Sequence, residues 1–204
     1  MGKAANSSIS LKQIHVTDNF WNKYVHLVKD VIIPYQWDIL NDKLEDVETS
    51  HCIENFKIAA GEKEGEFQGA VFQDTDVAKW LEAVGFVLNY ERDEKLEELA
   101  DETIELIGRA QQPDGYLNTY FTIKEPDGRW SNLMEGHELY TAGHMIEAAV
   151  AYYEATGKRR FLEIVSKFAD LVCQTFGSEE GKIHGYPGHQ EIELALDKAL
   201  PCNT

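Results

Sequence analysis

The chain has 204 residues, 43% of them hydrophobic, which is enough to bury a substantial core in one domain or slightly more. Nineteen Lys and Arg residues stand against 36 Asp and Glu residues, for a formal net charge of −17. This acidity argues against nucleic acid and anionic membranes as partners, because both are bound through basic patches.

Helical periodicity dominates the sequence, and strand patterns are nearly absent, so we expect an all-α protein. Residues 18–42 predict a long first helix that is kinked or broken at Pro34, since proline lacks the backbone N–H. Residues 52–60 predict a short helix that ends at Gly61.

From Asp74 onward, apolar residues recur at spacings of three and four, which predicts a helix with Asp74 or Thr75 as its cap. A second helix follows a turn at residues 89–93. It ends before the sequence Gln-Pro-Asp-Gly at 112–115, where Gly115 is free to adopt a positive φ.

The same pattern predicts three further helices. The third runs from about residue 135 to 156 and stops at Gly157, which is typical of a glycine just after a helix. The fourth covers roughly residues 159–176. The fifth begins near His189 and continues to the end of the chain.

The second pair of helices repeats the apolar pattern of the first pair. The shift is about 65 residues, as from Trp80 to Met145, and core positions coincide although identities do not. Such repeats indicate stacked units. The period is longer than the ~34–47 residues of common two-helix repeats, and the additional residues lie in the loops 112–134 and 177–188.

The third helix differs from the second and fourth, which are strongly amphipathic. One of its faces is apolar, and the other has few charges; it carries His137, Tyr140, Thr141, His144 and Ala148. A helix that is polar on neither face is usually buried, so we expect the third helix to be inner and the fourth outer. This alternation predicts an (α/α) toroid with its function at the long-loop end, where inner helices begin.

Two histidines open inner helices at equivalent positions of the repeat. His137 and His189 are therefore expected to converge on one pocket, where imidazoles can bind sugar hydroxyls or a metal ion. His144 lies two turns after His137 on the same face. It is either a binding residue or a core histidine whose ring nitrogens are hydrogen-bonded within the protein. Glu191 and Glu193 are explained by the favourable helix dipole in a first turn.

Two further groups of side chains are suited to sugar. The loop 111–120 is either a sugar contact or a structural turn, and it offers Tyr116, Asn118 and Tyr120. The start of the first inner helix offers Phe72, Gln73, Asp74, Asp76 and Trp80, although Trp80 lies deep in the apolar stripe and fits the core better.

No chemistry-bearing motif identifies a catalytic residue. A nucleophilic triad, a P-loop and a dinucleotide fingerprint are absent from the sequence, and spacing singles out no pair of carboxylates of the kind that glycoside hydrolysis uses. Three cysteines without a C-x-x-C pair imply neither a disulfide framework nor a self-contained zinc site. We therefore name no catalytic residue and no metal ligand.

The beginning of the chain carries no targeting signal that we can identify. It lacks the apolar stretch of a signal peptide, and Asn6 stands where a myristoylation motif needs Ser or Thr. No apolar run approaches the ~20 residues of a membrane span. A cytoplasmic protein is the default expectation.

Five stretches stand out together: IPYQW at 33–37, VFQDTDVAKWLEA at 71–83, AQQPDGYLNTYF at 110–121, GHELYTAGHMIEAAVAY at 136–152 and GYPGHQEIELAL at 185–196. In this order they resemble glycoside hydrolase family 127, the β-L-arabinofuranosidase-like enzymes, and the resemblance runs from about residue 10 to 196. It implies an (α/α)6 barrel followed by β-sandwich domains, and retaining hydrolysis of terminal β-L-arabinofuranosides. It also places His137 and His189 among the residues that contact the sugar.

The resemblance also implies that the catalytic residues lie downstream of the matched stretches. In that family the nucleophile is a zinc-bound cysteine thiolate, the acid/base is a glutamate, and zinc is held by further cysteines and a glutamate, all downstream of the stretches matched here. Cys52, Cys173 and Cys202 fall outside the cysteine-rich motif, and Cys173 is interpreted as a core residue. We expect no cofactor in this chain, and zinc only in the full-length family enzyme.

The domain prediction follows from the same comparison. The match fails around Pro201, so we place an N-terminal segment at residues 1–17 and an incomplete barrel, truncated at its C-terminus, at residues 18–204. About seven helices cannot close a barrel of twelve. An open array would expose the apolar flank of its last helix pair, and self-association through this open flank is expected.

Three hypotheses follow. The first is the N-terminal portion of a retaining glycoside hydrolase that supplies part of the pocket for an arabinofuranoside-like glycan and is inactive alone. The second is a non-catalytic carbohydrate-binding module. The third is a helical-repeat scaffold for protein partners, and the rim histidines count against it.

Overall fold

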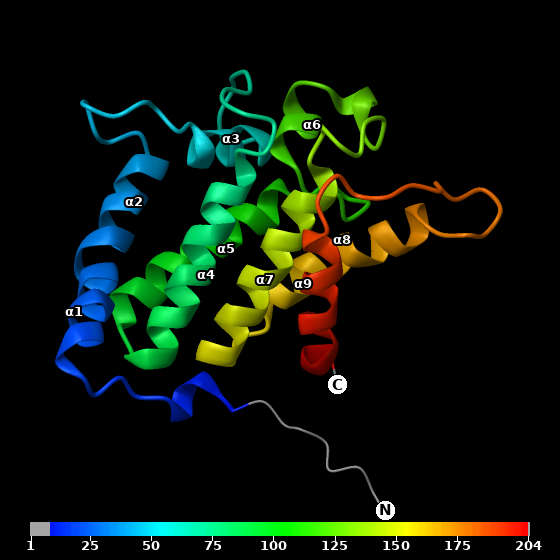
Figure 1. Ribbon diagram of the computed structural model, residues 1–204. Coiled ribbons are helices and arrows are strands. Elements are labelled where there is room, and N and C mark those ends of the chain that lie inside the picture. The colour runs from blue at the N-terminus through cyan, green and yellow to red at the C-terminus, as the bar shows by residue number, and fades with distance from the viewer. Residues whose placement is uncertain (1–8, 204) are drawn as a thin grey trace, which may run out of the picture.

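The computed structural model describes residues 9–203, and the regular secondary structure within them is helical apart from an isolated bridge between Phe176 and Ile183. This confirms the predicted all-α class. In chain order the helices are α1 (Asn19–Leu27), α2 (Ile33–Leu40), α3 (Cys52–Ala59), α4 (Asp74–Tyr90), α5 (Glu94–Ala110), α6 (Thr119–Ile123), α7 (Glu138–Thr156), α8 (Arg160–Thr175) and α9 (Glu191–Ala199) (Figure 1).

The expected break at Pro34 is absent. A π-helical turn, Val28–Ile32, joins α1 to α2, and the φ and ψ angles of Ile32 and Ile33 stay helical. A π turn widens the hydrogen-bonding pattern, which lets the chain accommodate a residue without a backbone N–H. Pro34 therefore sits in the first turn of α2, where no donor is needed.

The predicted cap of α4 is wrong. Gln73 occupies the N-cap position and its side chain makes no capping hydrogen bond, while Asp74 and Thr75 are buried. The Asp74 carboxylate points away from its own helix and accepts hydrogen bonds from the backbone N–H of Thr119, at 2.7 Å, and from the Thr119 hydroxyl. Asp74 thus ties α4 to α6.

Two short elements were not expected. Helix α6 lies inside the long 112–134 loop, and Asn118 caps it by accepting a hydrogen bond from the Phe121 N–H at 3.1 Å. The fifth predicted helix, α9, stops at Ala199 and is followed by a 3-10 turn, Leu200–Asn203, so it does not continue as one α-helix to the end of the chain.

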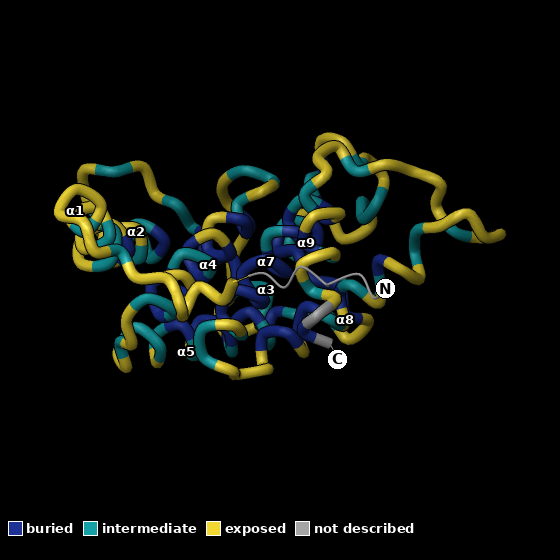
Figure 2. Tube along the Cα trace, turned by 60° about the horizontal axis from the view of Figure 1, so that its bottom comes forward, coloured by how far each residue is buried: buried dark blue, intermediate teal, exposed yellow. Residues whose placement is uncertain are grey.

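The helices form inner and outer layers as the repeat predicts. Helix α7 lies between α4 and α9, and α5 and α8 pack behind them (Figure 1). Figure 2 shows α4 and α7 largely buried, whereas α1 is exposed. The paired positions Trp80 and Met145 are both buried, at 2% and 0% exposure, which confirms the coincidence of core positions.

Two glycines allow the inner helices to approach one another closely. A Cβ atom on Gly85 of α4 would lie 2.8 Å from the backbone carbon of Ala151 in α7. A Cβ atom on Gly143 of α7 would lie 2.7 Å from Cγ of Glu191 in α9. Because neither contact leaves room for a methyl group, the backbones pack at these points.

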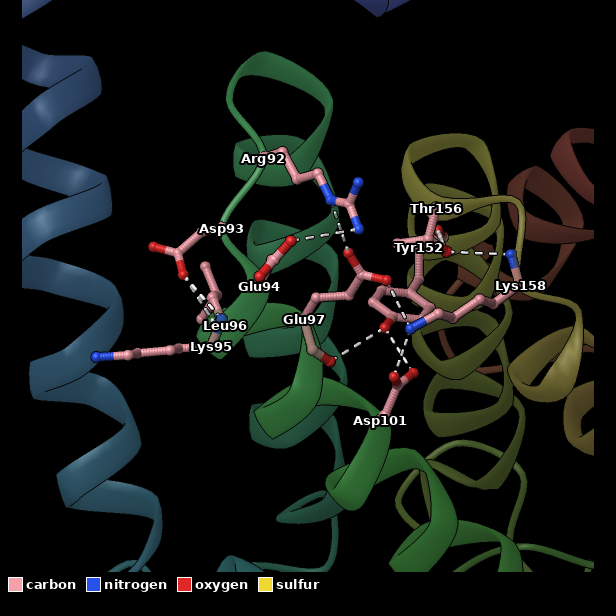
Figure 3. A network of polar contacts seen from close by, with 10 residues as sticks. All are labelled: Arg92, Asp93, Glu94, Lys95, Leu96, Glu97, Asp101, Tyr152, Thr156 and Lys158. Carbon is pink, nitrogen blue, oxygen red and sulfur yellow. Dashed lines mark hydrogen bonds and ion pairs between the residues drawn. The ribbon is translucent and has the colours of Figure 1, made fainter.

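The two ends of the helical array differ. The N-termini of α4, α7 and α9 lie at the end that carries the long loops, and short turns close the other end (Figure 1). At the short-loop end a polar network joins α5 to α7 (Figure 3). In it the Tyr152 hydroxyl donates to Asp101 at 2.7 Å, and Lys158 pairs with both Glu97 and Asp101.

Apolar side chains line the outer face of α1 and α2. Phe20, Tyr24, Val31 and Tyr35, spaced along one face, are between 47% and 58% exposed. The rings of Phe20, Trp21 and Tyr24 contact one another. In the part of the chain that the structure describes, no helix combines the length and the apolar character that crossing a membrane requires.

Candidate functional site

The structure brings the two rim histidines together. His137 is the N-cap residue of α7, and His189 precedes α9 by two residues. Their Nε2 atoms are 3.3 Å apart, and the ring centroids are 5.1 Å apart. The two side chains therefore come together as the repeat predicted, and their rings touch; that they share one pocket stays a prediction.

The backbone conformation at His137 and a contact with the chain just before it set the orientation of the His137 ring. Its φ of 54° is in the left-handed region, which is uncommon for a residue other than glycine. The ring nitrogen Nδ1 lies 2.6 Å from the carbonyl oxygen of Glu135. Since a carbonyl oxygen only accepts, Nδ1–H of His137 donates to it, and the other ring nitrogen, Nε2, faces Nε2 of His189.

Aromatic rings surround this histidine pair. The Tyr140 ring lies 5.7 Å from His137 and 4.9 Å from His189, measured between centroids, and Phe72 lies 5.2 Å from His137. His189 is exposed, and His137 and Tyr140 are half-buried. The group therefore offers hydrogen-bonding nitrogens and flat apolar surfaces at the open end of the inner helices.

A cavity of about 750 Å³ lies beside the histidine pair. Lys79 connects the two, because it lines the cavity and its Nζ donates to the Tyr140 hydroxyl at 3.2 Å. Most lining side chains come from α2, α4 and the loops that precede α3 and α4: Gln36, Ile39, Leu40, Glu48, Thr49, Ser50, Gly69, Ala70, Gln73, Asp76, Lys79, Trp80 and Ala83. Neither His137 nor His189 is among them.

Asp76 and Trp80 both contribute to this cavity, but in different ways. Asp76 accepts a hydrogen bond from Gln73 Nε2 at 2.7 Å, and partial burial raises the pKa of its carboxyl group while the nearby Lys79 opposes that shift. Trp80 is 2% exposed, and its indole N–H donates to the carbonyl oxygen of Ile33 at 3.1 Å. Trp80 is thus mainly a core residue whose edge reaches the cavity wall.

Tyr116 does not join the other candidate residues. It is 0% exposed, its hydroxyl donates to Glu138, and the Arg129 guanidinium lies 3.9 Å from the centre of its ring. Burial and the Glu138 carboxylate raise the pKa of the hydroxyl. In the 111–120 loop, Asn118 is buried as well and caps α6. These side chains make contacts that hold the loop in place. Such contacts fit a structural turn better than a sugar contact.

His144 belongs to a second cluster, which includes a residue that the sequence did not single out. Its Nδ1 lies 3.3 Å from Oε1 of Glu191, and Glu147 completes a group whose donor atoms all lie within 4.8 Å of one another. Burial, assisted by Lys79, lowers the pKa of His144 to about 4. The signal for Glu147 was its place one turn after His144 in a helix with few charges.

The cysteines do not fit the zinc site that the family resemblance implies. Cys52 is buried in α3 and donates to the carbonyl oxygen of Gln73, and Cys202 is buried after α9. Cys173 is exposed on α8, so its interpretation as a core residue is wrong. Among residues 9–203, no cluster of three possible metal ligands contains a cysteine. We therefore derive no chemical step through a thiolate-bound zinc ion.

Comparison with known proteins gives a consistent result. The chain is 45% identical over 201 residues to the non-reducing end β-L-arabinofuranosidase of Bifidobacterium longum subsp. longum, a match that covers 91% of this chain and 30% of that protein. A GH127 β-L-arabinofuranosidase structure from Geobacillus stearothermophilus T6 superposes with a TM-score of 0.91 at 63% identity, over 92% of this chain and 30% of that one. The GH127 β-arabinofuranosidase BT3674 gives a TM-score of 0.86 at 35% identity, over 96% and 31%.

These matches establish the fold as the N-terminal (α/α)-type part of such enzymes. The chain spans about 30% of the length of the relatives it matches. The family model described as "Beta-L-arabinofuranosidase, GH127 catalytic domain" matches residues 13–200. The chain belongs to this family of glycoside hydrolases, GH127.

Proposed function

We propose that this chain supplies part of the sugar pocket of a β-L-arabinofuranosidase-like glycoside hydrolase, with His137 and His189 as the sugar contacts. One observation carries the proposal. Two histidines from the starts of adjacent inner helices place their Nε2 atoms 3.3 Å apart at the open end of the array. A sugar hydroxyl both donates and accepts, so it can replace the contact between the two rings with one hydrogen bond to each.

The surroundings of the pair suit a small sugar. The rings of Tyr140 and Phe72 provide flat apolar surfaces, and Lys79 and Asp76 add charged groups along the adjoining cavity. Binding sites for small molecules commonly combine a concave apolar lining with a few placed polar groups. The substrate class that we propose is an arabinofuranoside-like glycan, because the relatives from Bifidobacterium longum and Geobacillus stearothermophilus are β-L-arabinofuranosidases.

We also propose that the chain is inactive on its own. The residues that the family resemblance requires are a cysteine nucleophile held on zinc and a glutamate acid/base, and the three cysteines here are dispersed over α3, α8 and the turn after α9. Burial, with Asp74 and Asp76 nearby, raises the pKa of Cys52 and keeps its thiol protonated. A protonated, enclosed thiol is a poor nucleophile.

The test measures binding and hydrolysis together. Methyl β-L-arabinofuranoside should bind the folded chain in calorimetry, and His137→Ala or His189→Ala should weaken binding about fivefold, the cost of one hydrogen bond of ~1 kcal/mol. The matched control is His184→Ala, an exposed histidine in the preceding loop. Affinity that both rim variants leave unchanged contradicts the sugar contact.

Hydrolysis of p-nitrophenyl β-L-arabinofuranoside is followed in the same preparations, with zinc and reductant added. We expect no release of nitrophenol above the rate in buffer. Release that Cys52→Ser or Cys173→Ser abolishes would show that a cysteine of this chain is the nucleophile, and the proposal of an inactive chain would then be wrong.

A second candidate function, association with another chain, rests on the apolar outer face of α1 and α2. A continuous row of half-exposed aromatic and aliphatic side chains, from Phe20 to Tyr35, is more than scattered apolar residues on a surface. Sedimentation at increasing concentration tests it. Self-association that Tyr24→Lys removes supports an interface at this face, and a monomer at all concentrations contradicts it.

A further inference from the structure

Three side chains from the inner helices α7 and α9 bring metal-ligating atoms to one place beside Tyr140. They are His144 and Glu147 of α7 and Glu191, the first residue of α9, and their donor atoms all lie within 4.8 Å of one another. Gly143 makes the arrangement possible, because it lets the backbone of Glu191 approach α7 closely. The cluster therefore lies where these two helices touch.

The cluster contains atoms that lack a partner. Both ring nitrogens of His144 and Oε1 of Glu191 are shielded from solvent and form no hydrogen bond. Nδ1 of His144 lies 3.3 Å from that oxygen, but the two groups do not meet in hydrogen-bonding geometry. Buried polar atoms without a partner are rare in folded proteins and call for an explanation, such as an ion that they bind.

The dimensions suit a zinc-type cation. Zinc bonds to nitrogen and oxygen at ~2.0–2.2 Å, which places two ligands of a tetrahedral ion about 3.4 Å apart. The separation of His144 Nδ1 from Glu191 Oε1 is 3.3 Å. The donor atom of the third ligand, Glu147, lies within 4.8 Å of the other two.

The charges near the cluster favour a cation. Three carboxylates face this place, from Glu82, Glu147 and Glu191, against the ammonium groups of Lys79 and Lys198. Two ammonium groups cannot balance three carboxylates, so a divalent ion can supply the missing positive charge.

Lys198 is the competitor for Glu147, since its ammonium group pairs with Oε1. Its side chain is 44% exposed, and it can turn into solvent when an ion occupies the site. His144 is ready to act as a ligand, because both of its ring nitrogens are shielded from solvent and form no hydrogen bond.

We propose that His144, Glu147 and Glu191 bind a divalent transition-metal ion of the zinc type and join α7 to α9 through it (Figure 1). One imidazole with two carboxylates favours zinc over magnesium and calcium, which prefer oxygen ligands alone. The site contains no sulfur ligand, in contrast to the thiolate-bound zinc that the family resemblance describes. It does not depend on the sugar contacts of His137 and His189.

The test is zinc binding by the whole chain after treatment with a chelator. Calorimetry should show one tight Zn²⁺ site per chain, and Co²⁺ at the same site should give the visible absorption of a four-coordinate ion. Zn²⁺ should raise the melting temperature, because it binds only the folded chain. X-ray absorption at the zinc edge should show nitrogen and oxygen ligands without sulfur.

Variants distinguish this site from the alternatives. Glu191→Gln and His144→Ala should each weaken Zn²⁺ binding roughly 100-fold or more, at the upper end of the loss that even outer-shell changes cause. The control His184→Ala should leave affinity unchanged, as should the double variant His137→Ala/His189→Ala. Circular dichroism confirms that each variant is folded, and Glu191→Gln keeps the size of the side chain.

Three results would overturn the proposal. Absence of a tight site would leave the three side chains as a buried polar cluster that binds no cation. Binding lost in the double variant but kept in Glu191→Gln would place the ion at the histidine rim. Sulfur ligation in the absorption spectrum would assign it to a cysteine.

Discussion

At the scale of single residues, Asp74 carries a buried carboxyl group whose proton is held more tightly in the folded chain than in the unfolded one. Burial raises its pKa from 3.8 to about 6, although hydrogen bonds from Thr119 oppose the shift. The resulting stabilisation is complete below pH ~4 and is lost as the pH rises through about 6. A shift of this size corresponds to about 3 kcal/mol.

Asp74→Asn removes this titration. The free energy of unfolding of the unmodified chain, minus that of the variant, should therefore fall by about 2 kcal/mol between pH 4 and pH 7. Chemical denaturation at each pH measures it, with Asp170→Asn on the exposed side of α8 as the control. A difference that stays constant with pH contradicts the buried, titrating carboxyl group.

Gly143 decides how closely α9 packs on α7. An added Cβ would lie 2.7 Å from Cγ of Glu191 and 2.8 Å from its backbone carbon, so Gly143→Ala should destabilise the chain by about 1–3 kcal/mol despite the better helix propensity of alanine. Gly108→Ala is the matched control, since its Cβ meets only the movable side-chain ends of Ile164 and Arg160. Equal stability of the two variants would show that the contact is not tight.

At the scale of elements, the network between α5 and α7 contains one buried and one exposed polar side chain, whose contributions to stability can be compared (Figure 3). Tyr152 is 1% exposed, and Tyr152→Phe leaves Asp101 without this donor, which should cost about 1–2 kcal/mol. Lys158 is largely solvated, so Lys158→Ala should cost less than about 1 kcal/mol. Urea denaturation compares the two, and a larger loss from the lysine variant would reverse this ranking.

The sequence predicted the helices and their layers because both depend on local pattern. Apolar spacing located α4, α5, α7 and α8 to within a few residues, and the low polarity of both α7 faces identified it as an inner helix. Local pattern could not predict that Asp74 turns away from its own helix toward Thr119. That choice depends on a loop 45 residues away.

The candidate site was predictable only in part, for a similar reason. The repeat makes the starts of the inner helices equivalent, so it predicted that His137 and His189 would lie close together. It carries no information about which side chains a loop buries, and Tyr116 proved to be enclosed by Glu138 and Arg129. The sequence did not identify Glu147, because it joins a cluster of possible metal ligands only when α9 places Glu191 beside it.

At the scale of the whole molecule, the net charge of −17 opposes the compact state through self-repulsion. Salt screens such repulsion, with a Debye length of ~10 Å at 0.1 M and ~3 Å at 1 M. Raising NaCl over this range should therefore raise the denaturation midpoint, as measured by fluorescence of the four tryptophans. A lower midpoint at high salt would mean that ion pairs such as Arg160–Glu105 outweigh the repulsion.

We propose that the inner helices present a sugar pocket at their long-loop end. The most direct measurement is NMR of the histidine side chains during titration with methyl β-L-arabinofuranoside. We predict that the ring signals of His137 and His189 shift together and saturate, while those of the exposed His26 and His184 do not move. Signals of the rim pair that stay unchanged at saturating sugar, or shifts confined to other histidines, would contradict the account.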